Sequence, residues 1–330
     1  MASWTRSERL HTLKQRGLRL LRFREMTILL VILLSFIVMA SVSPYFLTAM
    51  NLRSLFVGIS LDVIIAVGVT MGLVLGSMDI SVGSVLGLSA ATVGILLRGG
   101  MNPVLASVIA TGVGGAAGCV SGLVVTQLRI NAIIVTLAMF NAARGLAFVV
   151  TKGVPVTGFP SSFAVLGRGW IGPIPVPVFI MLVIIIAFSF LMRKASFFHK
   201  MYFVGSNPTA AQLSGISIRK TRFAALVISG LLAGLAGVIM ASRLSSVQPD
   251  YGAGTAFRVI AGALIGGVSL DGGRGTVFGA ALGVLFMGIV NNALILLGVS
   301  VVWQKVVLGG FLLLAVVVDK ALASRRTALA

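Results

Sequence analysis

The stretch 55–75, LFVGISLDVIIAVGVTMGLVL, decides the fold of this chain. Its 21 residues carry a single charge, at Asp62. A helix needs about 20 largely apolar residues to cross the roughly 30 Å hydrocarbon core of a membrane. The stretch therefore predicts a transmembrane helix, and runs of the same kind recur along the chain.

Cutting the sequence at charges, prolines and polar clusters predicts about ten spans. They cover residues 26–42, 55–75, 82–97, 103–127, 132–150, 174–192, 223–242, 255–270, 276–297 and 301–318. The third and eighth are short, so we expect tilted, re-entrant or broken helices there. The predicted fold class is all-α and polytopic, with a basic tail at 1–25, one transmembrane domain at 26–319 and a second tail at 320–330.

Composition excludes a water-soluble globule. The chain is 58% hydrophobic and 10% charged, with a mean hydropathy of +1.10, whereas soluble domains carry about 25% charged residues. The net charge of +19 does not indicate a nucleic-acid partner, because the cations flank apolar runs instead of forming a basic face. By the positive-inside rule they place both termini and the loop 193–222 in the cytoplasm, which favours an even number of spans.

Catalytic and metal chemistry are not expected. Cys119 is the single cysteine and lies in an apolar stretch, while His11 and His199 lie in basic polar segments. No GxxxxGK[ST] phosphate-binding motif occurs. The run 26–42 is longer than the apolar core of a signal peptide, which indicates an uncleaved first helix. The sequence thus predicts no metal, no cofactor and no enzyme, an intramembrane one included.

The longest polar segment after the N-terminus contains GSNPTAAQLSGISIRKTR at 205–222. Asn207 followed by Pro208 is typical of a helix start, and Gly215 of a helix end. We expect a short amphipathic helix across the cytoplasmic face. Taken alone, these residues favour a solvated connector.

The string GSNPTAAQLSGI at 205–216 resembles the cytoplasmic coupling segment of ribose-type, or monosaccharide-type, ABC importer permeases. Residues 76–90, 128–156, 261–283 and 291–319 resemble other parts of that family in the same order. The resemblance implies a type II ABC importer-like fold in the bacterial inner membrane and a small sugar as substrate. It also implies a separate ATPase that binds the ATP, a second permease copy or similar chain, and a periplasmic solute-binding protein. The residues that match the ATPase-coupling loop are Gly205, Asn207, Pro208, Ala210, Ala211, Gly215 and Ile216.

One departure from the family pattern concerns charge. Family members commonly carry acidic residues just before the eighth helix, where this chain has Ala256, Phe257 and Arg258. We expect these positions near the outer surface, where the solute-binding protein would dock. The substitution therefore bears on the binding protein and on the identity of the sugar.

Charged residues inside the spans form a second group of candidates. Asp62 and Arg144 each lie about seven residues from the outer end of their predicted helix, which suggests an ion pair; separate contacts with water are the alternative. Asp79 follows the second span and is suited to cap the next helix. A metal or proton site there would need a second carboxylate, for which Asp271 is the candidate.

Three uncharged polar residues also fall inside spans: Asn141, Asn291 and Asn292. Their amides suit hydrogen bonds to the hydroxyls of a passing sugar, or bonds between neighbouring helices. An ion-coupled secondary transporter remains the alternative function. It would need a carboxylate or a broken helix at mid-membrane, and the seven acidic residues are expected in tails, loops or outer thirds, which argues against it.

Overall fold

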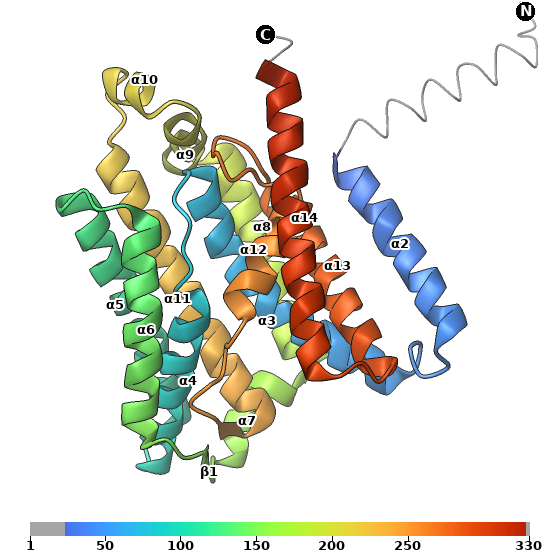
Figure 1. The fold of residues 1–330 in the computed structure, drawn as a ribbon. Helices are drawn as coiled ribbons and strands as arrows, with labels where there is room; N and C mark the ends of the chain where they lie inside the picture. Colours follow the sequence, from blue (N-terminus) through green and yellow to red (C-terminus); the bar gives the residue numbers. More distant parts are fainter. Residues whose placement is uncertain (1–23, 328–330) are drawn as a thin grey trace, which may run out of the picture.

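The computed structural model describes residues 24–327, which are almost entirely helical (Figure 1). The helices are α2 (Arg24–Val42), α3 (Ala49–Val74), α4 (Val82–Arg98), α5 (Pro103–Gln127), α6 (Ala132–Thr151), α7 (Ser161–Arg168), α8 (Val176–Lys194), α9 (Ser196–Ser206), α10 (Pro208–Leu213), α11 (Ile218–Leu244), α12 (Thr255–Ile265), α13 (Val277–Leu296) and α14 (Val301–Thr327). Most of the predicted tail 1–25, including His11, lies outside the described residues.

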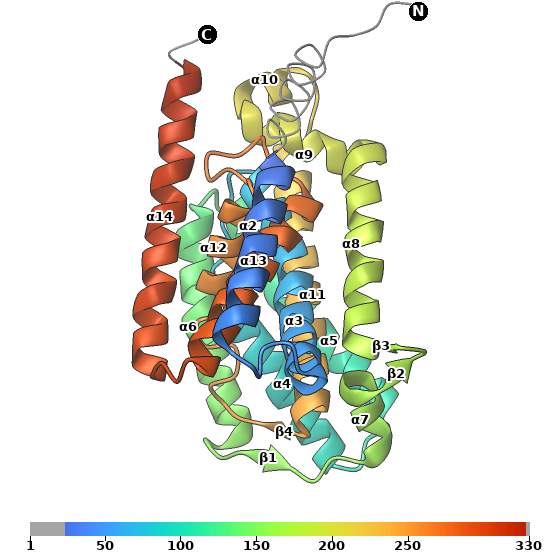
Figure 2. The same cartoon turned by 90° about the vertical axis from the view of Figure 1, so that its right-hand side faces the viewer.

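Four two-residue strands lie at the end of the bundle opposite α10 (Figure 2). β1 (Val156–Thr157) pairs antiparallel with β4 (Ser246–Val247), with Val156 opposite Val247. β2 (Trp170–Ile171) pairs antiparallel with β3 (Ile174–Pro175). Below, the two ends of the bundle are called the α10 end and the β1 end.

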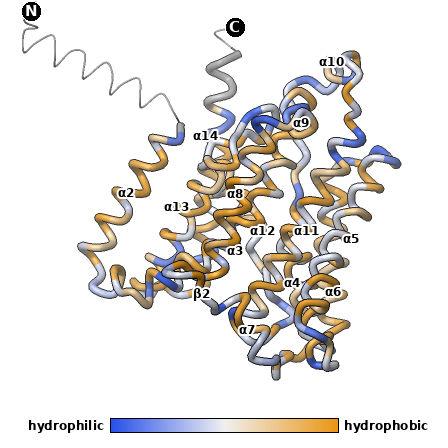
Figure 3. Tube along the Cα trace, turned by 180° about the vertical axis from the view of Figure 1, so that it is seen from behind, coloured by the Kyte–Doolittle hydropathy of each residue, from blue (hydrophilic) through white to orange (hydrophobic). Residues whose placement is uncertain are grey.

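Eight of the described helices are long and apolar enough to cross a membrane: α2, α3, α5, α6, α8, α11, α13 and α14. Their middle portions are hydrophobic, and hydrophilic residues gather toward the two ends (Figure 3). α4 has 17 residues and α12 has 11. At 1.5 Å per residue α12 is about 16 Å long, roughly half of a hydrocarbon core. The third and eighth predicted spans are therefore short, as expected.

Several boundaries differ from the sequence-based expectation. α3 begins at Ala49, six residues before the predicted start, because Thr48 accepts the N–H of Asn51 as an N-cap. α12 ends at Ile265, and a glycine-rich loop replaces the rest of the predicted span 255–270. α14 continues to Thr327, so the predicted tail at 320–330 begins within a helix.

Small residues bring α5, α11 and α3 into close contact. A side chain at Gly114 would collide with the carbonyl of Gly230, and one at Gly118 with the carbonyl of Leu226. Gly68 on α3 lies against Ser229 on α11 in the same way. Lipid gives no hydrophobic incentive for helices to associate, so close backbone approach supplies dispersion contacts instead. Gly114 and Gly118, four residues apart on α5, therefore form an internal packing surface.

The two short helices start at half height inside the bundle. Asp79, just before α4, accepts a 2.7 Å hydrogen bond from Ser229, near the middle of α11. Arg258, in the first turns of α12, pairs with Asp62, which is 13 residues from Ala49 and 12 from Val74 on α3. The starts also touch each other, since Gly83 lies against the carbonyl of Gly252. Two broken helices thus meet in the interior.

These contacts belong to an inverted repeat. α3–α6 and α11–α14 both run long, short, long, long, and an aspartate (Asp79 or Asp250) precedes each short helix. α3 packs on α12 and α13, as α11 packs on α4 and α5. α3 starts at the β1 end, whereas α11 starts at the α10 end (Figure 1). Repeats of opposite direction are typical of transporters and place broken helices at the membrane midplane.

Candidate functional site

A bidentate ion pair forms the centre of the candidate site. Arg258 donates from Nε to Asp62 Oδ2 at 2.7 Å and from Nη2 to Asp62 Oδ1 at 3.0 Å. Nη2 also donates to Thr255 Oγ1 at 3.2 Å. Paired, parallel hydrogen bonds between guanidinium and carboxylate are stronger than neutral ones and fix the orientation of both groups. The pair therefore fastens the start of α12 to the middle of α3.

The predicted partner of Asp62 is wrong. Arg144 on α6 donates from Nη1 to the carbonyls of Pro249 and Tyr251, at 3.2 and 2.7 Å. Its Nη2 is buried without a partner among the described residues. Because α3 starts at Ala49, Asp62 lies deeper than its predicted position about seven residues from the helix end. Arg144 instead anchors the extended segment that leads into α12.

The departure at the eighth helix also lies elsewhere than expected. Ala256 is 2% exposed, and Arg258 lies at half height against Asp62 instead of near the outer surface. The chain's substitution of alanine and arginine for carboxylates therefore changes the charge of the bundle interior.

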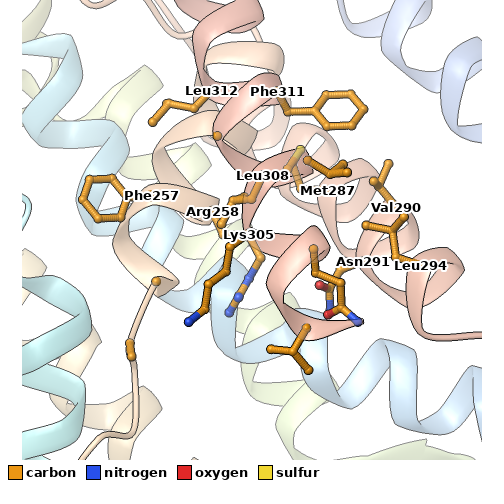
Figure 4. A pocket seen from close by; sticks show the side chains of 16 residues that line it. Phe257, Arg258, Met287, Val290, Asn291, Leu294, Lys305, Leu308, Phe311 and Leu312 are labelled. Atoms are coloured by element: carbon orange, nitrogen blue, oxygen red, sulfur yellow. The ribbon is translucent and has the colours of Figure 1, made fainter. Parts of the chain in front are cut away.

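Two adjoining hollows surround the ion pair. A cavity of about 280 Å³ lies between α3, α11, α12 and α13 and is lined by Asp62, Arg243, Thr255 and Asn292. A larger hollow of about 620 Å³ lies between α12, α13 and α14 (Figure 4). Arg258 and Asn291 line both. These two side chains therefore stand at the junction of the two spaces.

The three asparagines have different surroundings. Asn292 exchanges two hydrogen bonds with Asn51, at 2.8 and 3.1 Å, and so ties α13 to α3. The side-chain amide of Asn291 has no hydrogen-bond partner among the described residues, and Asn291 lines both hollows. Asn141 lies exposed on α6, where it donates to the carbonyl of Leu137 at 3.1 Å. Of the three, Asn291 has the free amide best placed to bind a solute.

Asp79 organises the turn that precedes α4. Its Oδ1 accepts from the Ser81 N–H at 2.9 Å and from Ser81 Oγ at 2.6 Å, and its Oδ2 accepts from Ser229. The carboxylate thus bonds the backbone of the N-cap residue, just before the helical positions that we expected it to cap. Asp271 does not join it, since Asp271 pairs with Lys320 at 2.8 Å.

The expected distribution of acidic residues is also wrong. Asp62 and Asp79 both lie at half height, next to helix interiors, and not in the outer thirds of the spans. Asp62 is neutralised by Arg258. All hydrogen bonds to Asp79 come from serine residues. The position of the carboxylates therefore does not argue against ion coupling.

The predicted coupling segment forms α9 and α10. Asn207 accepts the Ala210 N–H at 3.0 Å and Pro208 occupies the first turn, so the predicted short helix is confirmed as α10. Gly215 ends it with a φ of 79°. Ala211 is buried and Ile216 packs on the core, whereas Ala210 and Leu213 face outward, Leu213 with 86% exposure.

Gly205, one of the residues that match the coupling loop, lies at a close contact between helices. It lies inside α9, and a side chain there would collide with the carbonyl of Val74 at the end of α3. That carbonyl also accepts the Gly273 N–H at 2.7 Å. Three segments therefore meet at Gly205: the end of α9, the end of α3 and the loop before α13.

Tyr202 adds a second connection at this junction. Its hydroxyl donates to the carbonyl of Gly275 at 2.9 Å. Burial raises the pKa of the Tyr202 hydroxyl, and this effect is larger than the opposing effect of nearby Arg193. The hydroxyl therefore remains a donor at neutral pH. A displacement of α9 would thus reach both α3 and the loop that joins α12 to α13.

The sequence reasoning missed Arg258, Arg243 and Asn51 as site residues. Arg243 donates to the backbone and side chain of Ser54, at 3.2 and 3.4 Å, beside the smaller cavity. A signal for Arg258 was available. A cation inside an apolar span is costly enough to require an acidic or polar partner.

The model of the family described as "Branched-chain amino acid transport system / permease component" matches residues 51–316 of this chain. The chain belongs to this permease family. The match covers both broken helices, the coupling segment and the central ion pair. It also makes the chain a multi-pass protein of the inner membrane, in keeping with its eight long apolar helices.

Curated permeases are similar over most of their length. The ribose import permease protein of Bacillus subtilis is 37% identical over 86% of this chain and 89% of its own. The L-arabinose ABC transporter permease of Azospirillum brasilense is 38% identical over 92% and 89%. The D-allose transport system permease of Escherichia coli is 34% identical over 87% and 88%. No solved structure matches the chain.

Proposed function

We propose that this permease is the membrane-spanning subunit of an ABC importer that carries a small sugar inward by alternating access. The observation that carries the proposal is the similarity along nearly the whole chain to permeases for ribose, L-arabinose and D-allose. In this proposal a separate ATPase subunit binds and hydrolyses ATP, and the permease holds no cofactor and performs no catalysis.

The chemistry of the central hollows supports a polyhydroxylated, uncharged solute. Asp62 and Arg258 neutralise each other, while the Asn291 amide can both donate and accept hydrogen bonds. A volume of about 620 Å³ lies in the usual range for sites that bind small molecules. The apolar walls, which include Phe257 and Met287, would contact the carbon face of a sugar.

We infer that the α10 end faces the cytoplasm. Residues 193–222, at that end, hold six Lys and Arg residues, and the first residues of α2 and the last of α14 lie there too (Figure 1). The eight long helices give eight crossings. α4 and α12, each taken together with the segment that precedes it, add one crossing apiece, which gives ten spans. This is the arrangement expected of a type II importer.

The α10 end would then receive the ATPase. Leu213 is a large exposed apolar side chain on a helix held rigidly by the Asn207 cap and the Gly205 junction. At the opposite face of the membrane, a periplasmic solute-binding protein would deliver the sugar to the β1 end. A second permease copy or a similar chain would complete the pathway beside the larger hollow between α12, α13 and α14.

An ion-coupled secondary transporter is the second candidate, and one observation favours it. Asp79 is a carboxylate at half height whose three hydrogen bonds all come from serine hydroxyl or backbone groups. Such a group could exchange a proton or bind a cation during transport. The two functions differ in their energy source, which a direct experiment separates.

The experiment combines affinity capture with transport. We expect the tagged chain, purified in mild detergent, to carry an ATPase that is lost with Leu213→Arg and retained with Val154→Arg, a matched exposed position at the β1 end. In proteoliposomes the complex should accumulate a labelled pentose or hexose only with ATP inside the compartment that holds the ATPase. Uptake driven by a proton or sodium gradient, without any ATPase, would overturn the proposal.

A further inference from the structure

A third hollow, of about 810 Å³, lies at the α10 end and has a lining of one charge sign. It is bounded by residues 76–78, by the α5–α6 connection at 125–133 and by residues 212–222. Arg129, Arg219 and Arg222 line it, and no carboxylate does. It is separate from the two central hollows and shares no lining residue with them.

The three arginines have no partners among the residues that the structure describes. Within residues 24–327, none of their side chains makes a hydrogen bond or ion pair, and Arg222 Nε is buried without one. Arg258 and Arg243, by contrast, donate to a carboxylate and to Ser54. Arg129 and Arg219 are exposed, and Arg222 is half-buried. Three guanidinium groups around one hollow that has no carboxylate in its lining favour an anion as its occupant.

The backbone at the start of α11 makes the position of its cations more unfavourable without a ligand. Arg219 and Lys220 lie in the first turn of α11, which contains no acidic residue. Helix N-termini favour anions and disfavour cations. An anion in the hollow would offset the like charges at the start of α11.

Exposed apolar side chains lie beside the hollow. Leu128 and Ile130 flank Arg129 and are 66% and 38% exposed, and Ile133 at the start of α6 is 45% exposed. A free phosphate would gain nothing from these side chains. A phospholipid would use both parts, with its phosphate on the guanidinium groups and its acyl chains along α5 and α6.

We propose that this hollow binds the phosphate of an anionic phospholipid from the leaflet at the α10 end. The pairing of guanidinium groups with phosphate is bidentate and strong, and basic pockets between transmembrane helices at the cytoplasmic face are suited to anionic headgroups. The proposal does not depend on which solute the protein carries. It places a structural lipid against the connection between α10 and α11, next to the proposed ATPase contact.

The test is lipid binding by the purified chain in nanodiscs and by native mass spectrometry. We expect the wild-type chain to retain phosphatidylglycerol in preference to phosphatidylcholine by at least about tenfold. Arg129→Gln with Arg222→Gln should remove that preference. The matched control, Arg193→Gln with Lys194→Gln, removes two cations at the same end but outside the hollow, and should leave it unchanged.

The alternatives give different results. Loss of bound lipid on addition of millimolar inorganic phosphate, with no effect of acyl chains, would assign the hollow to a free anion and overturn the lipid source. Loss of ATPase capture in the Arg129/Arg222 variant, with lipid preference unchanged, would assign it to acidic residues of the ATPase. If the variant fails to fold, the wild-type preference decides alone, and an equal retention of both lipids contradicts the proposal.

Discussion

The arginines at the centre of the bundle and those at the α10 end differ in one respect: the central ones have partners inside the chain. Arg258 binds Asp62, and Arg144 binds the carbonyls of Pro249 and Tyr251. Arg129 and Arg222 bind nothing in the described chain. At mid-membrane lipid headgroups are out of reach, so the fold must supply the counter-charge. Near the interface the surroundings can supply it.

We expect the largest loss of stability when one member of the Asp62–Arg258 ion pair is removed. Asp62→Ala leaves Arg258 buried without a carboxylate and should lower the free energy of unfolding by about 3–5 kcal/mol. Thermal unfolding in detergent and the yield of folded protein measure this. The single neutralisations at the α10 end should cost much less.

Replacing both members of the ion pair tests whether the loss of stability comes from an unpaired charge. Asp62→Leu with Arg258→Met removes both charges and should restore most of the stability, since buried ion pairs are often replaceable by apolar groups. Transport should remain impaired, because the polar junction of the two hollows is lost. If Asp62→Ala alone melts at the wild-type temperature, the pair is not a stabilising contact.

A second prediction concerns the junction that would carry motion between the two regions. Gly205→Ala places a methyl group against the Val74 carbonyl, and we expect it to destabilise the fold by about 1–3 kcal/mol, as overpacking does. ATP-driven uptake should fall more than stability. Gly310→Ala on α14 is the matched control, since nothing lies within 4 Å of its added carbon and it does not line the larger hollow. Equal effects of the two changes would contradict the role of Gly205.

The smallest effects should separate two neighbouring asparagines. Asn292→Ala removes the reciprocal bonds to Asn51 and should cost about 0.6–1.7 kcal/mol of stability, the range for hydrogen bonds between membrane helices. Asn291→Ala should leave stability unchanged and raise the apparent KM for the sugar. Unfolding and uptake curves of both variants test this. A KM change confined to Asn292→Ala would reverse the assignment.

Local pattern was enough for much of the architecture. The apolar runs, the two short spans, and the Asn207–Pro208 start and Gly215 end of α10 are visible along the chain, because each depends on residues within about 20 positions. The resemblance to a sugar-permease family likewise came from short sequence segments that match the family in the same order. The sequence also placed charges at the helix ends that determine the predicted orientation.

Side-chain partners were decided only by the tertiary structure. The position of Asp62 or Arg144 along the sequence gives its depth in the membrane once the start of its helix is known. It does not give the direction in which the side chain points. That direction depends on how α3, α6 and α12 rotate against one another. The close approach of Gly205 to Val74 and the cluster of Arg129 with Arg222 join segments far apart in sequence. Sequence by itself determined where the membrane lies; the packing of backbone against backbone determined which charges meet inside it.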